Sequence, residues 1–518
     1  MIIFEWVLAI LLGAVLLSVL ANKMAVPYPA LLALGGTVIA FIPGAPRIVL
    51  EPDLALALFV APVLLDAAYD TSPRDLRDDW LPVTCLVLVA VGLTTGAVAV
   101  VAHGLTAMPW AAAIALGAIV APPDAAAATA VLRQVRLPHR IVTILEGESL
   151  LNDASALLIY RVAVTAMSAG SITLGSTAPT FLLTVMGSLI AGPVLALTYM
   201  RLVAVLNRSG DALTSVLLQF IGTFGVWLLA DRIGLSGILT IVAYAITIAR
   251  RAPAITPARV RVPSYAVWET AVFVLNVLAF VLIGLQIGPI FESLAPDQRT
   301  GYLLISVAVL ATVLLVRFAW VMSYNTLARW RIERVGFHPP RPMMAPTVKG
   351  GLVVAWCGMR GIVTLVAALA LPNGDGGPAF PFRDLIIFVA FSVVLGTLLL
   401  QGLTLRPLLM KLDLRDDDPV GQEVARARLV AYQAALASLK GEQSRLAEAL
   451  RVELEDALVR ANGQAAADDP DGSADGLRLR AVNSARSALL GLRRSGEIGD
   501  AAFHRLEEEM DRIELSAS

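Results

Sequence analysis

Long apolar runs separated by short polar segments fill most of the chain. Between residues 2 and 411 each run holds about 17–30 residues, and about 20 apolar residues are enough for a helix to cross the hydrocarbon core of a bilayer. The pattern predicts an all-α polytopic membrane protein in which residues 1–411 form the membrane domain. Thirteen spanning helices are expected, at about residues 2–20, 26–42, 52–69, 82–104, 109–133, 140–169, 178–206, 212–230, 234–250, 266–291, 301–328, 346–372 and 384–411.

The composition excludes several other classes of protein. Hydrophobic residues make up 57% of the 518 and charged residues 16%, whereas soluble domains have about 45–50% and about 25%. The 40 basic residues are balanced by 41 acidic ones, so no nucleic-acid partner is expected. The two cysteines and four histidines lack metal-ligand spacing. We also expect no cofactor, no ATP drive and no enzymatic activity.

Basic residues are distributed unevenly among the loops. The loops after odd-numbered runs carry 17 Lys and Arg residues, and the loops after even-numbered runs carry 4. Short loops rich in Lys and Arg stay in the cytoplasm. The alternation therefore predicts a plasma-membrane protein with its N-terminus outside the cell and its C-terminus inside.

The chain changes character at about residue 412. Residues 414–462 are rich in Ala, Leu, Glu and Arg, which predicts one long soluble helix. The segment AAADDPDGSADG (465–476) is typical of a linker, and two shorter helices are expected after it. Residues 412–518 are therefore predicted to form a helical cytoplasmic tail. A plain solvated tail and a regulatory or dimer-contact role both remain open.

The first polar interruption lies in the fifth run, in GAIVAPPDAAAATAVL. Pro122 and Pro123 each lack a backbone donor and clash with the preceding turn, so the helix must end or unwind there. Unwound backbone at membrane depth is tolerated only inside protein or beside water. Asp124 follows directly, and a carboxylate at a discontinuous helix is typical of ion sites in secondary transporters.

The second interruption, ILEGESLLNDASALLIYR, lies in the sixth run. Ser149 and Asp153 are four residues apart and share a helix face. Glu148 and Asn152 have the same spacing on the adjacent face. A charge at mid-bilayer costs at least about 2.5–3.5 kcal/mol, so such groups line a cavity or pair with each other. Asp153 is the one followed by further apolar residues, and we expect it to be embedded.

The third interruption, WCGMRGIVTLVAALALP, lies in the twelfth run. Arg360 stands between Gly358 and Gly361, and glycine weakens a helix. A second discontinuous helix is expected here, and matching interruptions in two halves of a transporter point to its binding site. Because arginine keeps its proton, Arg360 needs a buried anion, for which Glu148 is the candidate. Asp66, in FVAPVLLDAAYD, is either an outer carboxylate of the site or a helix-end charge.

Four segments resemble the bacterial and animal Na+/H+ exchangers, in the single-aspartate, electroneutral branch of the cation:proton antiporter superfamily. The longest, residues 117–161, contains the specific motif GESLLND; LNVLAFVLIGLQ (275–286), WCGMRGIVTLVAALALP (356–372) and APVLLDAAY (61–69) are similar to three more. The resemblance covers about residues 1–410. It implies a thirteen-helix fold with inverted repeats, broken fifth and twelfth helices, and assembly as a homodimer in the lipid bilayer.

The resemblance also implies the ligands of the ion. Asp153 is the main ion- and proton-binding carboxylate, and Asp124 is its partner where the broken helices cross. Ser149 and the backbone carbonyl of Pro123 supply further oxygens. The monovalent cation is therefore expected at Asp153 and Asp124. One departure from the family is that Pro123-Asp124-Ala125 stands where Thr-Asp-Pro is usual, which bears on ion selectivity.

Four more residues are implied in supporting roles. Asn152 orients the site, Glu148 pairs with Arg360, and Asp66 acts through water. The expected function is antiport of Na+, or Li+, against H+, one for one, for pH and sodium homeostasis. The alternatives are K+/H+ antiport, a cation channel or uniporter, and an intramembrane aspartyl hydrolase with an Asp124–Asp153 dyad.

Overall fold

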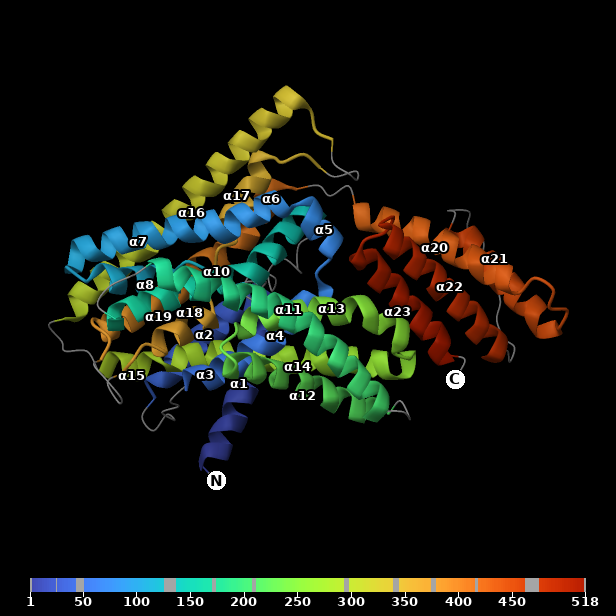
Figure 1. Ribbon diagram of the computed structural model, residues 1–518, viewed down its shortest axis with the longest axis horizontal. Helices are drawn as coiled ribbons and strands as arrows, with labels where there is room; N and C mark the ends of the chain where they lie inside the picture. Colours follow the sequence, from blue (N-terminus) through green and yellow to red (C-terminus); the bar gives the residue numbers. More distant parts are fainter. Residues whose placement is uncertain are drawn as a thin grey trace.

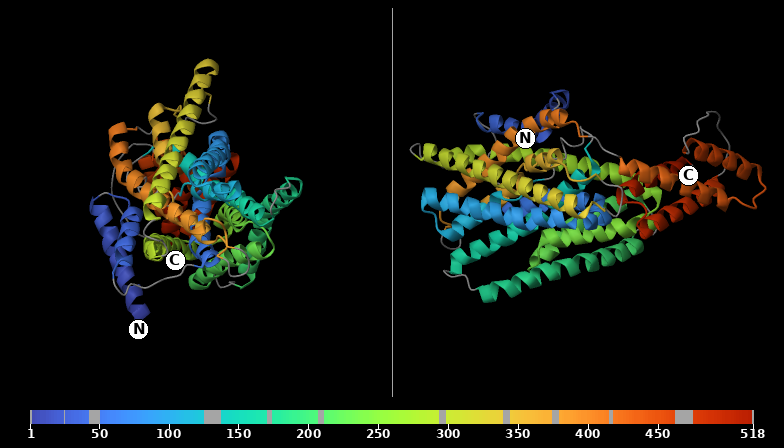
Figure 2. Two further views of the ribbon diagram at one scale, coloured as in Figure 1. Left: turned by 90° about the vertical axis from the view of Figure 1, so that its left-hand side faces the viewer. Right: turned by 90° about the horizontal axis from the view of Figure 1, so that it is seen from above.

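The structure, a computed structural model, describes residues 2–24, 26–42, 51–124, 137–169, 174–206, 211–292, 298–338, 344–373, 379–414, 418–461 and 475–516. Every regular element within these ranges is helical. The helices up to residue 412 lie side by side and mostly lengthwise, and α20–α23 are gathered at one end of them (Figures 1 and 2). The sequence prediction of an all-α chain is confirmed for this part of the protein.

The first half of the membrane domain contains helices of very different lengths. Residues 52–70 and 80–106 are each one continuous helical segment that contains a π-helical stretch, labelled η1 and η2. The elements are α1 (Ile2–Met24), α2 (Tyr28–Ala40), α3 (Pro52–Ala55), η1 (Leu56–Val60), α4 (Ala61–Asp70), α5 (Pro73–Asp78), α6 (Trp80–Thr84), η2 (Cys85–Ala90), α7 (Val91–Thr106), α8 (Trp110–Val120) and α10 (His139–Ala169).

The second half contains the longest helices. The elements are α11 (Leu174–Leu206), α12 (Ala212–Arg232), α13 (Gly237–Ile255), α14 (Ala258–Leu285), α15 (Ile287–Glu292), α16 (Arg299–Val335), α17 (Val348–Trp356), α18 (Ile362–Leu369) and α19 (Arg383–Leu412). Between α17 and α18, residues 357–361 are not helical. This gap falls where the sequence predicts the second discontinuous helix.

Eight helical segments of the described residues are long and apolar enough to cross a membrane. They coincide with eight of the thirteen predicted runs. Large apolar side chains are exposed along several of them, for example Leu183 on α11 (72%), Leu213 on α12 (76%) and Leu315 on α16 (68%). Such a surface is unfavourable in water and suits contact with lipid chains.

Small residues let the membrane helices approach closely. Gly36 of α2 and Gly284 of α14 face each other, and a Cβ on either would overlap backbone atoms of the other helix. Gly117 of α8 lies in the same way against the backbone of Thr95 in α7. In lipid, helices associate by this kind of backbone packing because burial from water supplies no driving force.

The described residues after α19 form four helices, here called the tail. They are α20 (Pro419–Ser438), α21 (Arg445–Ala461), α22 (Asp475–Ser495) and α23 (Asp500–Ser516). The prediction of one helix over 414–462 was wrong, because the chain turns between α20 and α21, where Gly441 has a φ of 92° that other residues rarely adopt. The tail has its own apolar cluster, made of Val424, Ala427, Ala431, Ala435, Ala481, Val482, Ala485, Leu489, Ile498, Ala502, Phe503, Leu506 and Met510.

Candidate functional site

The end of α8 is where the site begins. The helix stops at Val120, and Pro122 and Pro123 follow, so two backbone donors that would continue it are missing. Asp124 comes next in non-helical backbone. The remainder of the predicted fifth run lies outside the described residues.

The backbone after α8 meets the gap between α17 and α18. The Asp124 amide donates to the carbonyl oxygen of Met359 at 2.7 Å. Within the same gap, the next residue, Arg360, donates from its backbone amide to Thr397 Oγ1 of α19 at 3.0 Å. Two non-helical segments that are far apart in the sequence therefore bind each other inside the protein, which satisfies donors that lost their helical partners.

The guanidinium of Arg360 binds carbonyl oxygens at this crossing. Its Nε donates to Val120 O and its Nη1 to Gly358 O, both at 2.8 Å, and the residue is 1% exposed. Val120 is the last residue of α8, and Gly358 follows the end of α17. The carboxyl end of a helix carries a partial negative charge that a nearby cation stabilises. Arg360 thus neutralises the ends of two helices at once.

Glu148 pairs with Arg317, and the predicted pairing with Arg360 is therefore corrected. Arg317 Nη1 and Nη2 donate to the two carboxylate oxygens at 2.5 and 2.9 Å, with both side chains almost fully buried. Arg317 also lies against Gly358, since a Cβ built on Gly358 would be 2.5 Å from Cδ of Arg317. The available signal was the position of Arg317 deep inside the apolar run 301–328, which by itself did not distinguish it from Arg360.

Asn152 connects α10 to the backbone after α8. Its Nδ2 donates to Pro123 O at 2.8 Å, and the residue is fully buried. This carbonyl is the one predicted to bind the ion. Since a carbonyl oxygen has two lone pairs, the bond from Asn152 holds Pro123 O in place and leaves one pair for a ligand.

Asp153 lies next to Asn152 on α10 and is 8% exposed. The charges of Asp124 and Arg360 both act on its carboxyl group. The Asp124 carboxylate in turn lies against Gly361, so closely that a Cβ there would overlap Oδ2. Gly361 immediately precedes α18, and the amino end of a helix favours a negative charge.

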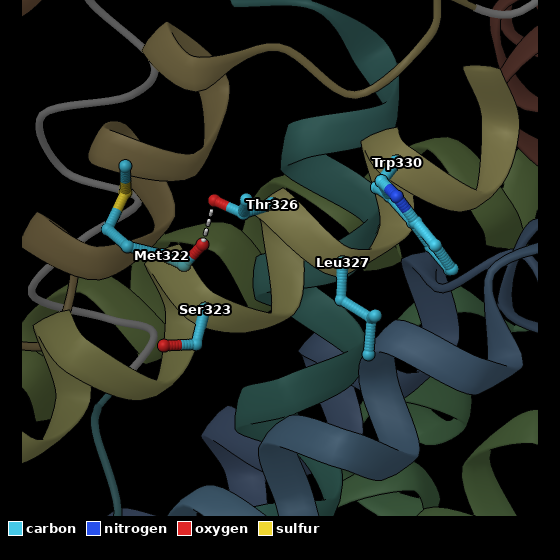
Figure 3. A pocket seen from close by; sticks show the side chains of 5 residues that line it. All are labelled: Met322, Ser323, Thr326, Leu327 and Trp330. Atoms are coloured by element: carbon cyan, nitrogen blue, oxygen red, sulfur yellow. Dashed lines mark hydrogen bonds between the residues drawn. The ribbon is translucent and has the colours of Figure 1, made fainter.

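The roles of Ser149 as a ligand and of Asp66 as an outer carboxylate stay predictions. Ser149 is half-buried on α10, one turn before Asp153, and Asp66 is half-buried on α4. A groove of about 540 Å³ on α16 is separate from this site. It is lined by side chains of that one helix: Met322, Ser323, Thr326, Leu327 and Trp330 (Figure 3). None of the predicted site residues lines it.

Comparison with known proteins assigns the family. The family model described as "Sodium/hydrogen exchanger, transmembrane" matches residues 7–411. The chain belongs to the sodium/hydrogen exchanger family. This is a family of transporters, in agreement with the expectation that the chain is not an enzyme.

The exchanger is similar to several bacterial proteins along most of its length. It is 31% identical to an uncharacterized Na+/H+ exchanger of Mycobacterium tuberculosis, over 98% of this chain and 95% of that protein. It is also 31% identical to a sodium, potassium, lithium and rubidium/H+ antiporter of Bacillus pumilus, over 83% of this chain and 65% of the relative. Among solved structures, the sodium proton antiporter MjNhaP1 of Methanocaldococcus jannaschii has the same fold, with a TM-score of 0.56 at 19% identity over 80% of this chain and 99% of that one.

Proposed function

We propose that this exchanger carries one monovalent cation against one H+ by alternating access at a site formed by Asp153 and Asp124. The observation that supports this most is the position of the two carboxylates at the crossing of two interrupted helices, beside Arg360. The guanidinium of Arg360 is held at this crossing by the carbonyl oxygens of Val120 and Gly358.

The charges at the crossing support a one-for-one exchange. When Asp153 and Asp124 are both ionised they carry two negative charges, and Arg360 supplies one positive charge. The Glu148–Arg317 pair is neutral by itself. One negative charge is left inside the protein, where an unpaired charge is costly. One H+ or one monovalent cation neutralises it equally well, so the two compete for the same place.

The oxygen atoms around the site suit a hard cation. Carboxylates of Asp153 and Asp124, the carbonyl of Pro123 and the hydroxyl of Ser149 are the kinds of ligand that hard metal ions take in proteins. We propose Na+ as the main substrate, with Li+ as a second one. K+ is the alternative, because the Bacillus relatives are named for potassium as well as sodium.

The proposed arrangement in the membrane completes this function. We propose thirteen spans, which comprise the eight long segments, the three shorter apolar helices Leu8–Ala21, Tyr28–Ala40 and Trp110–Val120, the helix α13 and the α17–α18 pair. They form inverted repeats with the N-terminus outside, the tail in the cytoplasm and the protein as a homodimer in the plasma membrane, as the family resemblance and the loop charges imply.

A transport assay tests the proposal. Purified protein is placed in liposomes with a trapped pH dye, and Na+, Li+ or K+ is added to wild type and to Asp153→Asn. We expect a cation-dependent proton flux in wild type that is absent in the variant. Asp231→Asn, at the exposed end of α12, is the matched control and keeps the wild-type rate.

Three results would contradict the proposal. Proton flux at the wild-type rate in Asp153→Asn would remove that residue from the site. Cation flux without proton counter-flux would favour the channel alternative. A membrane potential imposed with a permeant anion leaves the rate of one-for-one exchange unchanged, and a rate that follows the potential would exclude electroneutrality.

A further inference from the structure

The tail is bound to the membrane domain through buried ion pairs. Arg261 on α14 pairs with Asp511 and, at 3.0 Å, with Glu507, both on α23. All three residues are at most 3% exposed. Beside them, the ring of Tyr69 on α4 stacks on His504 of α23, with centroids 5.8 Å apart. Charges this deeply buried require each other, so α23 is fixed to the ends of α4 and α14.

A second contact joins the tail to the short helix α5. Arg74 Nη2 donates to both oxygens of Glu423, at 2.6 and 2.8 Å, and its Nη1 donates to Gly496 O at 2.5 Å. Glu423 also accepts from the Gly499 amide at 2.6 Å. One arginine of the membrane domain therefore binds α20 and the turn between α22 and α23 together.

The helix α5 is in turn bound to the beginning of α10. Asp75 Oδ2 lies 2.9 Å from His139 Nε2, and Asp79 Oδ1 accepts from Arg140 Nε at 2.9 Å. The side chain of Leu76 packs on Gly147, where a Cβ would be 2.7 Å from Leu76 Cδ1. Gly147 precedes Glu148, so α5 touches α10 one residue from the Glu148–Arg317 pair.

The tail thus holds two groups of helices at once. The helix α4 packs on both α13 and α14, whereas α10, which carries Asp153, packs chiefly on α8 and less on α4 and α13. Alternating access is largely a rigid-body movement of one helix bundle against another. A movement of α10 against α14 would strain the connection from Arg261 through the tail to Arg74, α5 and His139.

We propose that the tail docks on Arg261 and Arg74 as an intramolecular restraint that slows the movement of α10 and, with it, cation/H+ exchange. The occupant of this surface is the chain's own acidic helix α23 together with Glu423. The effect on rate rests on the function proposed above, whereas the restraint on α5 and α10 does not.

The test releases the restraint from the tail side, where the fold of the membrane domain is left intact. Glu423→Gln and Asp511→Asn keep the shapes of the side chains and remove the charges. We expect faster hydrogen–deuterium exchange in residues 73–79 and 139–147, measured by mass spectrometry in the full-length protein. In liposomes we expect the initial exchange rate to rise about fivefold, the lower end of ordinary coupling between sites.

Two further variants control for damage to the tail. Glu508→Gln removes a charge that is exposed on α23 and pairs only with Arg512 of the same helix in the described part of the chain, and we expect wild-type values for both measurements. The charge exchange Arg74→Glu with Glu423→Arg rebuilds the ion pair in reverse but not the bonds to Gly496 O and from the Gly499 amide. We expect it to restore slow hydrogen exchange and a slow rate in part, relative to Arg74→Glu alone.

The outcomes separate the restraint from the transport function. Unchanged hydrogen exchange in both segments would overturn the proposal whatever the rate does. Faster hydrogen exchange without a faster transport rate would overturn the claim that the restraint slows exchange. If wild type moves no protons with any cation, the proposed function fails, and the hydrogen exchange of Glu423→Gln alone decides whether the restraint exists.

Discussion

The Asp124 carboxylate rests on the Cα of Gly361, the residue that precedes α18. This contact places a negative charge at the amino end of a helix in the middle of the protein. It also explains why residue 361 is a glycine, although its extended backbone conformation is open to other residues. No other residue fits there, because the nearest Asp124 oxygen occupies the place where a Cβ would be.

Gly361→Ala is therefore expected to abolish cation-dependent proton flux while the protein still folds. The added methyl group must displace the Asp124 carboxylate and separate it from Asp153. Flux in liposomes measures the effect. Gly96→Ala, on an exposed face of α7 with open space around it, is the matched control and keeps the wild-type rate. Normal flux in Gly361→Ala would show that Asp124 does not have to occupy this position.

Glu148→Gln is expected to destabilise the protein by about 3–5 kcal/mol, because it leaves Arg317 buried without its carboxylate. Thermal unfolding in detergent measures the loss. Adding Arg317→Met removes the unpaired charge and should recover most of the stability. If Arg360→Met recovered it instead, the partner of Glu148 would be Arg360 after all. The exposed pair of Arg161 and Asp231, at 3.9 Å, is the control and contributes about 0–1 kcal/mol.

Asn152→Ala is expected to raise the KM for the cation more than it lowers the maximal rate. The substitution removes the donor that holds Pro123 O, and an unpaired buried carbonyl costs about 1–3 kcal/mol. Asn325→Ala removes a similar bond, from Asn325 Nδ2 to Thr347 O, away from the site, and should leave KM unchanged. Equal changes of KM in the two variants would assign Asn152 a merely structural role.

Arg360→Lys is expected to retain only part of the exchange rate, and Arg360→Met none. Lysine keeps the positive charge but cannot bind Val120 O and Gly358 O with a planar fork, as the guanidinium does. Liposome flux of the two variants separates charge from geometry. A full rate in Arg360→Lys would mean that the charge alone is needed.

Part of the candidate site was predictable because it depends on rules that act within a few residues. Prolines 122 and 123 remove two adjacent backbone donors beyond the first turn of the helix, so the helix ends or unwinds there. The spacing of Asn152 and Asp153 from Glu148 and Ser149 places them on neighbouring helix faces. The partner of Glu148 was not predictable, since Arg317 and Arg360 are both buried arginines in apolar runs. Choosing between them requires the packing of α16 against α17, where Gly358 admits Arg317.

The tail, too, was predictable from the sequence only in part. Its helical character followed from composition, but its contacts did not, because Arg74 and Arg261 look like ordinary basic loop residues in the sequence. In the structure Arg261 is 3% exposed and pairs with two carboxylates that lie about 250 residues further along the chain. Nothing in local sequence spacing encodes a pairing over such a separation.

The sequence by itself determined that the chain is a helical membrane protein with carboxylates and an arginine inside its apolar runs. Hydrophobic length and the cost of a buried charge are properties of single segments, and they can be read without a partner. Only the tertiary structure decided which buried charges meet, which carbonyl oxygens Arg360 binds, and that the tail is joined to α10 through Arg74 and α5. Those choices depend on which helix faces pack together, and packing brings together residues that are distant in the sequence.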